Sequence, residues 1–235
     1  MTHKTTFGRI LYTSKKPERM DQERGREWFV ITKHGDGSRT LTAHSEIDDA
    51  PAVIRDISIT LDEKWAPCDS TVRLTVGGNF MGTGWFKFDG TEAECQTFTA
   101  NEGRVDQRMT LDKPVRGFGN HAIINDSLIL SAFDLSKGKG VQKVDPLLLS
   151  SLDHRGATGP MMCRSNVTYD FVGEEKCTVG AGTFDALHFR IVDPDMPVEH
   201  PPYEIWCTAD GDYIFLKGAV TGYMMTYYEL MELER

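Results

Sequence analysis

Turn residues interrupt this sequence at short, regular intervals, and that spacing restricts its fold more than any other feature. The runs REWFVITK and RTLTAHSEI flank the turn HGDGS, and the runs STVRLTV and FMGTGWFKFD flank the turn GGN. Hairpins of this kind place consecutive strands side by side, and alternating side chains then give the sheet two different faces. The sequence therefore predicts an antiparallel meander.

One segment, about residues 117–153, interrupts the strand pattern. Within it, GFGNHAIINDSLILSAFDLSKG has helical spacing, with Asn120 as the predicted N-cap and Gly138 beyond the predicted end. At 100° per residue, one predicted helix face carries His121, Asn125, Leu128, Ala132 and Leu135. We expect this helical insert to lie across the sheet and to turn that face inward.

The 235 residues permit one large all-β domain or two small ones. No linker separates the strands before the helical insert from the strands after it. This favours a single domain of residues 25–235, with residues 1–24 as an N-terminal arm or edge strand. Two domains divided near residue 140 are the alternative. Because long meanders curl to bury one face, the predicted fold is all-β with a helical insert: a single curved antiparallel β-barrel or half-barrel, a lipocalin-like cup.

Charge and cysteine content limit the partners and the compartment. The net charge of −9 argues against binding to nucleic acid or an anionic membrane. The five cysteines are scattered and form no C-x-x-C pair, which is typical of a reducing compartment. The N-terminal sequence has no apolar signal region, and no run has the roughly 18 apolar residues of a membrane span. We expect a soluble, cytoplasmic protein whose open sheet edge would allow a homodimer.

The C-terminal strands carry a resemblance. VGAGTFDALHFRIVD contains an Ala-Gly-Thr-Phe turn into a strand (Ala181 to Phe184), and YEIWCTADGDYIFLKG contains a Tyr-x-x-Trp strand (Tyr203 and Trp206) followed by a hairpin. This part resembles bacterial proteins of a domain-of-unknown-function family with a β half-barrel, a fold related to the lipoprotein-carrier proteins. The resemblance implies a curved sheet with an apolar concave face, and it carries over no catalytic residues. Those proteins are usually exported, and this sequence shows no export signal.

Two motifs that could hold a phosphate or a metal have simpler interpretations. The glycine-rich VGGNFMGTGWF lies between two strands without a following helix N-terminus, so it is interpreted as a hairpin. In VDPDMPVEHPP, Asp193, Asp195, Glu199 and His200 could ligate a divalent cation, but the prolines and the absence of a known ligand spacing favour a stiff connection. We predict no metal and no cofactor.

SLDHRGATG places Asp153 beside His154. Adjacent side chains point apart on most backbones, so a catalytic Asp–His pair is not expected there. A plain exposed loop is favoured over a loop that rims a pocket.

The remaining polar candidates lie in the helical insert and on strand faces. His121 could act as a general acid or base if its pKa is near neutrality, and arginines could stabilise an anionic oxygen. Aromatic side chains could hold the rings of a substrate. The predicted catalytic residues are His121, Arg55, His188 and Arg190. The predicted substrate-binding residues are Asn125, His44, Trp85, Trp206, Tyr223 and Tyr227.

These features predict a cofactor-independent acid–base enzyme, of lyase, isomerase or hydratase type. Its substrate would be a small hydrophobic, aromatic or polycyclic molecule in a β-barrel cavity. One alternative is a non-catalytic carrier or sensor of an apolar ligand, and another is a partner-binding β domain without a cavity. For His121 alone, the alternative role is a structural hydrogen bond at a helix end.

Overall fold

The computed structural model describes residues 3–194 and 200–235. Fifteen strands account for most of the described chain. The strands before the helical segment are β1 (Lys4–Ser14), β2 (Glu23–Lys33), β3 (Arg39–Ile47), β4 (Val53–Leu61), β5 (Pro67–Val76), β6 (Asn79–Asp89), β7 (Glu92–Thr99), β8 (Gly103–Thr110) and β9 (Gly117–Gly119). The strands after it are β10 (Gly140–Leu149), β11 (Cys163–Val179), β12 (Gly182–Pro194), β13 (Tyr203–Thr208), β14 (Phe215–Val220) and β15 (Thr226–Glu234).

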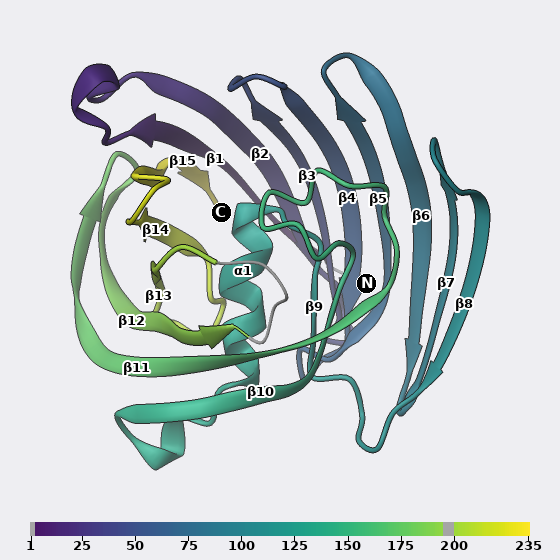
Figure 1. The fold of residues 1–235 in the computed structure, drawn as a ribbon. Coiled ribbons are helices and arrows are strands. Elements are labelled where there is room, and N and C mark those ends of the chain that lie inside the picture. The colour runs from purple at the N-terminus through teal and green to yellow at the C-terminus, as the bar shows by residue number, and fades with distance from the viewer. Residues whose placement is uncertain (1–2, 195–199) are drawn as a thin grey trace.

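All fifteen strands belong to one sheet, in the order β8-β7-β6-β5-β4-β3-β2-β1-β15-β14-β13-β12-β11-β10-β9 (Figure 1). Every neighbouring pair is antiparallel except β9 and β10, which run parallel. Strands from both sides of the helical segment therefore share one sheet. The predicted all-β fold, built on one curved and mainly antiparallel sheet, is therefore confirmed.

The N-terminal segment is not the arm or edge strand that the sequence predicted. β1 is hydrogen-bonded on one side to β2 and on the other to β15. Ile10, for example, lies opposite Glu27 of β2 and Leu230 of β15. The last strand of the chain thus pairs with the first, and the sheet edges fall at β8 and β9 instead.

The helical segment is shorter than predicted and begins later. The helix α1 covers Ile123–Ile129 and is followed by the 3₁₀ helices η2 (Leu130–Ala132) and η3 (Leu135–Lys137). A third 3₁₀ helix, η1, covers Pro17–Arg19. The N-cap of α1 is Ala122, so the prediction of Asn120 at this position was wrong. No helix in the described part of the chain is long and apolar enough to cross a membrane.

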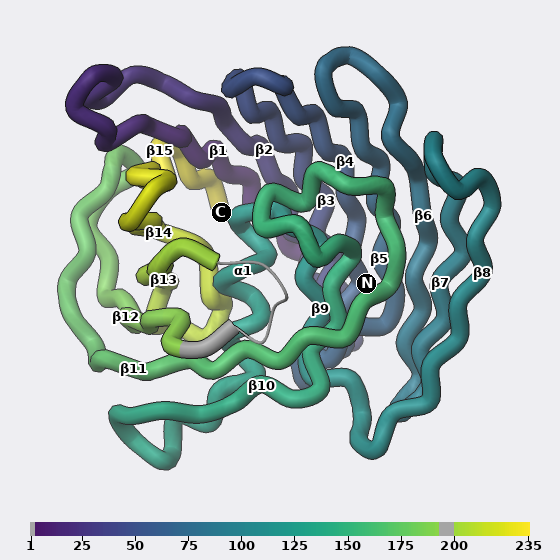
Figure 2. Tube along the Cα trace, viewed as in Figure 1, coloured from purple at the N-terminus to yellow at the C-terminus, as the bar shows by residue number. Residues whose placement is uncertain are grey.

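The sheet curls so that α1 lies on its concave side, surrounded by the second set of strands (Figures 1 and 2). α1 contacts β9, β13 and β14. Irregular register in β11, between Thr168 and Tyr169 and between Phe171 and Gly173, allows this 17-residue strand to bend around the helix. The concave face holds the core, in which Ile124 and Leu128 of α1 are fully buried.

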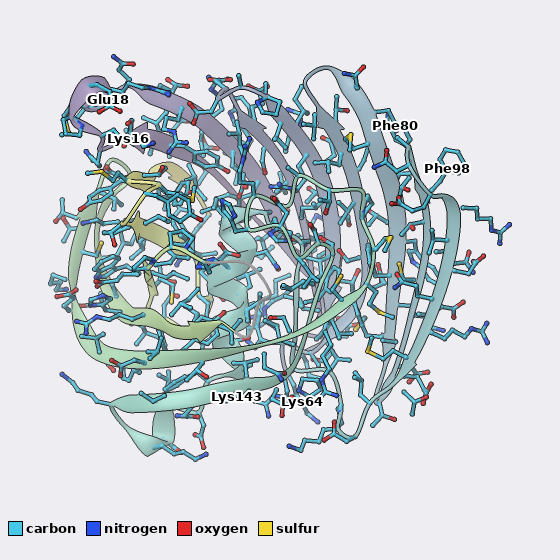
Figure 3. The ribbon with its side chains drawn as sticks, in the orientation of Figure 1. Lys16, Glu18, Lys64, Phe80, Phe98 and Lys143 are labelled. Carbon is cyan, nitrogen blue, oxygen red and sulfur yellow. The ribbon has the colours of Figure 1, made fainter. Side chains whose placement is uncertain are left out.

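The loop between β10 and β11, residues 150–162, crosses the concave face of the first set of strands (Figure 2). Pro160 packs against Gly82 of β6, and Gly159 packs against Thr99 of β7. The convex face of these strands is exposed, and Figure 3 shows Phe80 and Phe98 at the outer rim of β6 and β7. The side of the sheet that can enclose a site is therefore the concave side.

Candidate functional site

A cavity of about 110 Å³ lies between α1 and the strands from β9 to β15. Most of its wall is apolar. The apolar lining residues include Ile123, Ile129, Leu147, Leu149, Val167, Ile191, Ile205, Val220 and Met224. The polar lining residues are His121, Asp126, His154, Tyr169, His200, Tyr203 and Tyr228.

Asp126 of α1 is the acidic group among the described residues of this cavity. The hydroxyl of Tyr203 in β13 donates a hydrogen bond to Oδ2 of Asp126 at 3.3 Å. Burial, with a further contribution from the charge of Glu27, raises the pKa of Asp126 to about 7. This carboxyl can therefore take up and release a proton near neutral pH, which is the property required of a general acid or base.

Glu27 of β2 fixes the position of α1. Its side chain is fully buried and accepts the backbone N–H groups of Ile123 at 2.9 Å and Ile124 at 2.8 Å. It also accepts the hydroxyls of Tyr12 at 3.0 Å and Ser45 at 2.7 Å. The methyl side chain of Ala122 cannot accept a hydrogen bond and so cannot cap α1. Glu27 of β2 instead accepts the free N–H groups at the start of this helix. The position of Asp126 in the cavity depends on this contact.

His121 lines the cavity but is not part of the helix. Its backbone has φ of 64°, and its Nε2–H donates to the carbonyl oxygen of Ser151 at 3.1 Å. Because a carbonyl only accepts, Nδ1 is the unprotonated nitrogen. Burial and the positive charge of Arg55 lower the pKa of His121 to about 3. The prediction of a pKa near neutrality was therefore wrong, and the imidazole is a weak base.

Arg55 of β4 is 2% exposed and holds two loops together. It donates to the backbone oxygens of His121 at 2.6 Å, of Gly156 at 3.4 Å and of Arg155. Backbone carbonyl oxygens are therefore the hydrogen-bond partners of this buried guanidinium among the described residues.

Two histidines in loops, His154 and His200, line the cavity. For His154, the sequence favoured a plain exposed loop. His154 lines the cavity, so its loop is not a plain exposed loop. Asp153 does not pair with it, because its Oδ1 accepts the backbone N–H groups of Arg155 and Ala157.

Asp195 and Glu199 lie outside the described residues, as do the side-chain surroundings of Asp193. In the described part of the chain, no group of His, Cys, Asp and Glu side chains is arranged to hold a metal ion.

His188 and Arg190 do not reach the cavity. Side chains alternate along β12, and the apolar Ile191 faces the cavity, which turns His188 and Arg190 outward. His188 Nε2 lies 2.7 Å from Glu204 Oε2, and its ring stacks on Trp206 with 4.0 Å between centroids. Trp206 is therefore on the convex face as well.

The other predicted ligand contacts are also displaced from the cavity wall. His44 lies on the convex face, with Nδ1 2.6 Å from Asp56 Oδ1. Trp85 is 38% exposed, and the ring of Tyr227 lies beneath Lys15 and Lys217. In each strand, the residues on either side of these positions occupy the concave face, so the alternation of side chains leaves these three outside.

Tyr223 and Asn125, which were predicted to bind the substrate, are also not part of the cavity wall. Tyr223 is 48% exposed, and its ring makes an edge-to-face contact with His154, at 6.0 Å between centroids. Asn125 is buried, and its Nδ2 donates to the carbonyl oxygen of Phe118 at 2.8 Å. The polar residue of α1 that faces the cavity is its neighbour, Asp126.

Sequence reasoning missed Asp126, Glu27, Tyr203 and Tyr228. A signal existed for the first two. Asp126 is the one charged residue in the apolar run AIINDSLIL, and Glu27 shares its strand face with Phe29 and Ile31. A buried carboxylate must be paired or hydrogen-bonded, so either position could have been singled out on that ground.

Comparisons with known proteins support the fold. No protein-family model matches the chain, and a search of curated proteins finds no significant match. The structure is similar to a β-barrel-like protein of the domain of unknown function DUF1849 from Brucella abortus, with 10% sequence identity, 99% of this chain and 96% of that chain covered, and a TM-score of 0.57. A Bacteroides fragilis protein with a YmcC-like fold matches at 8% identity, with 98% and 95% covered and a TM-score of 0.33. At such low identity, the first of these likenesses concerns the β-barrel-like fold alone.

Proposed function

We propose that this protein binds a small hydrophobic molecule in the concave cavity and catalyses proton transfer on it, with Asp126 as the acid or base. The reaction would be an elimination, isomerisation or hydration and needs no cofactor. The sheet would then serve as a lipocalin-like cup, with α1 inside it supplying the reactive group.

The observation that carries this proposal is the position of the Asp126 carboxyl. It lies in a mostly apolar cavity, and one of its oxygens accepts a hydrogen bond from Tyr203. A carboxylate in an apolar site is a stronger base than one in water, because water no longer stabilises its charge. Tyr203 is a positioning residue, since its hydroxyl orients the carboxyl.

In this proposal His121 is not the general acid or base that the sequence predicted. As a neutral imidazole, its Nδ1 can accept a hydrogen bond from a bound molecule. His188 and Arg190 have no place in the proposal, because they lie on the convex face.

Base-promoted ring opening of 5-nitrobenzisoxazole tests the proposal. A base removes the C3 proton, the N–O bond breaks, and the product is a coloured cyanophenolate, so no second reactant is required. We expect the protein to accelerate this reaction, with a rate that rises as Asp126 ionises around pH 7. Asp126→Asn should lower the rate at least about 100-fold, within the usual contribution of a general base. His121→Gln should retain most of it, because 5-nitrobenzisoxazole has no N–H or O–H group that could donate to Nδ1 of His121. An equal rate for the Asp126→Asn variant and the unmodified protein would refute the assignment.

A carrier or sensor of an apolar ligand is the second candidate. The apolar wall favours it, as does the resemblance of the C-terminal strands to a half-barrel family related to lipoprotein carriers. The two candidates differ in one respect: a carrier would bind a neutral aromatic such as 2-naphthylmethanol without accelerating the ring opening.

A further inference from the structure

We propose that the ligand is an amphiphilic carboxylate, whose apolar body occupies the cavity beside Asp126 and whose anionic group binds at Arg55 and Arg155 in an adjoining cavity. The placement of the apolar body rests on the proposed function. The anion site rests on separate observations.

A second cavity, of about 60 Å³, adjoins the first. The two share five wall residues, which are His121, Ile123, His154, Met224 and Tyr228. Their chemistry differs. The described lining of the first contains no lysine or arginine, whereas Arg24, Arg55 and Arg155 line the second. A ligand that spans both would therefore have one apolar end and one anionic end.

Two of these three guanidinium groups form no ion pair with a carboxylate of the described residues. Arg24 is paired with Asp49. Arg55 donates only to backbone carbonyl oxygens, and Arg155 donates from Nη2 to the carbonyl oxygen of Pro51 at 3.1 Å. Glu27, a carboxylate buried in the same region, already accepts four hydrogen bonds from other groups. The described lining of the second cavity thus has three guanidinium groups and no carboxylate, while the charges of Glu27, Asp126 and Asp153 act on Arg55 from outside this lining.

Burial has removed the hydration of the Arg55 guanidinium, and its hydrogen-bond partners among the described residues are neutral carbonyl oxygens, so its charge is only partly compensated by the more distant carboxylates. A bound carboxylate would supply an opposite charge, and its two oxygens match the paired N–H groups of a guanidinium. A carboxylate is also small enough for a cavity of about 60 Å³. Held there, it would direct the apolar body toward Ile129 and Val220 of the first cavity, where Asp126 can reach a carbon-bound proton.

Isothermal titration calorimetry with 2-naphthoate and 2-naphthylmethanol tests the inference, because the two probes differ mainly in charge. We expect the protein to bind 2-naphthoate at least about tenfold more tightly, as a charge-assisted hydrogen bond allows. Arg155→Gln should remove most of this preference and leave 2-naphthylmethanol binding within about twofold, while Arg155→Lys should keep part of it. Arg155 is chosen because Arg55 holds two loops together and its replacement would disturb the fold.

Arg104→Gln, on the exposed strand β8, is the matched control and should leave both affinities unchanged. Equal affinity for the two probes in the unmodified protein would overturn the anion site and leave the proposed apolar cavity standing. A preference for 2-naphthoate that survives Arg155→Gln would also overturn it. If neither probe binds, both the inference and the proposed function fail.

Discussion

The hydroxyl of Tyr203 in β13 donates a hydrogen bond to the carboxylate of Asp126 in α1, across 3.3 Å. Burial raises the pKa of Tyr203 well above its usual range, so its hydroxyl keeps its proton and remains a donor. This contact joins the helix to the sheet inside the cavity. It also favours the ionised form of Asp126 and opposes the effect of burial on that carboxyl.

Removing this donor should raise the pKa of Asp126. In Tyr203→Phe, the ionised carboxylate loses its hydrogen bond, and we expect its pKa to rise from about 7 by on the order of one unit. The ¹³C chemical shift of the Asp126 carboxyl, followed by NMR against pH, measures this change. Tyr169→Phe is the control, because Tyr169 lines the same cavity and donates no described hydrogen bond to Asp126. The same titration midpoint in all three proteins would contradict the prediction.

The dependence of stability on pH should differ between the protein and Asp126→Asn. The pKa of Asp126 is raised from 3.8 to about 7 on folding, so the folded state holds this proton more tightly than the unfolded state. The contribution of Asp126 to stability is therefore complete below pH 3.8 and is lost as pH rises through 7. Glu27, Tyr203 and Arg55 act on Asp126, and all three remain in the variant.

The free energy of unfolding of Asp126→Asn, relative to the unmodified protein, should thus increase between pH 4 and pH 8. The increase should be on the order of a few kcal/mol, at about 1.4 kcal/mol per pKa unit. Urea unfolding at several pH values measures it. A difference that stays constant over this range would show that Asp126 has an ordinary pKa.

Glu27→Gln should destabilise the protein. All four of its contacts are donors, so the carboxylate acts only as an acceptor. The NH₂ of a glutamine would face the backbone N–H of Ile124 at the Oε1 position or that of Ile123 at the Oε2 position, and would leave it unpaired in the core at about 1–3 kcal/mol. Urea unfolding at pH 8 measures the loss. Glu232→Gln is the control, because Glu232 forms an exposed pair with Arg9, and its change should cost less than about 1 kcal/mol. Equal losses in the two variants would mean that Glu27 does not hold α1.

The strand pattern of this protein could be predicted because its strands alternate and its turns have typical residues. The pairing of β1 with β15 could not, because it joins the two ends of the chain and no local pattern specifies it. Turn chemistry specifies hairpins between neighbours in sequence, whereas this pair depends on how far the whole sheet curls.

The helix shows why the site was only partly predictable. A single helix from His121 onward would place His121 and Asn125 on one face, but the positive φ of His121 ends that regularity before α1 begins. Within α1, Asn125 and Leu128 share the buried face, and the neighbouring face, with Ile123, Asp126 and Ile129, lines the cavity. Adjacent helix residues lie 100° apart, so Asn125 faces the core while Asp126 faces the cavity, and the sequence pattern alone does not distinguish a face against the core from a face against a cavity.

Residues on the convex face should not affect ligand binding. Arg190→Gln and Trp85→Leu alter exposed side chains on the convex face, opposite the face that lines the cavity, so they should change the affinity for 2-naphthylmethanol by less than about twofold. Met224→Trp, which places an indole in the cavity wall, should weaken it at least about tenfold by filling the space. Calorimetric titration of the three variants measures these affinities. A loss of binding in Arg190→Gln would contradict the prediction and indicate a binding site on the convex face.

The most direct measurement is a methyl NMR titration of the ¹³C-labelled protein with 2-naphthylmethanol. If the concave cavity is the binding site, the methyl signals of Ile129 and Val220, which line it, should shift with a common saturation curve. Those of Val141 and Val192, which are 59% and 55% exposed, should stay in place. Shifts confined to the exposed valines, or no saturable shift at Ile129 and Val220, would contradict the presence of a ligand site inside the sheet.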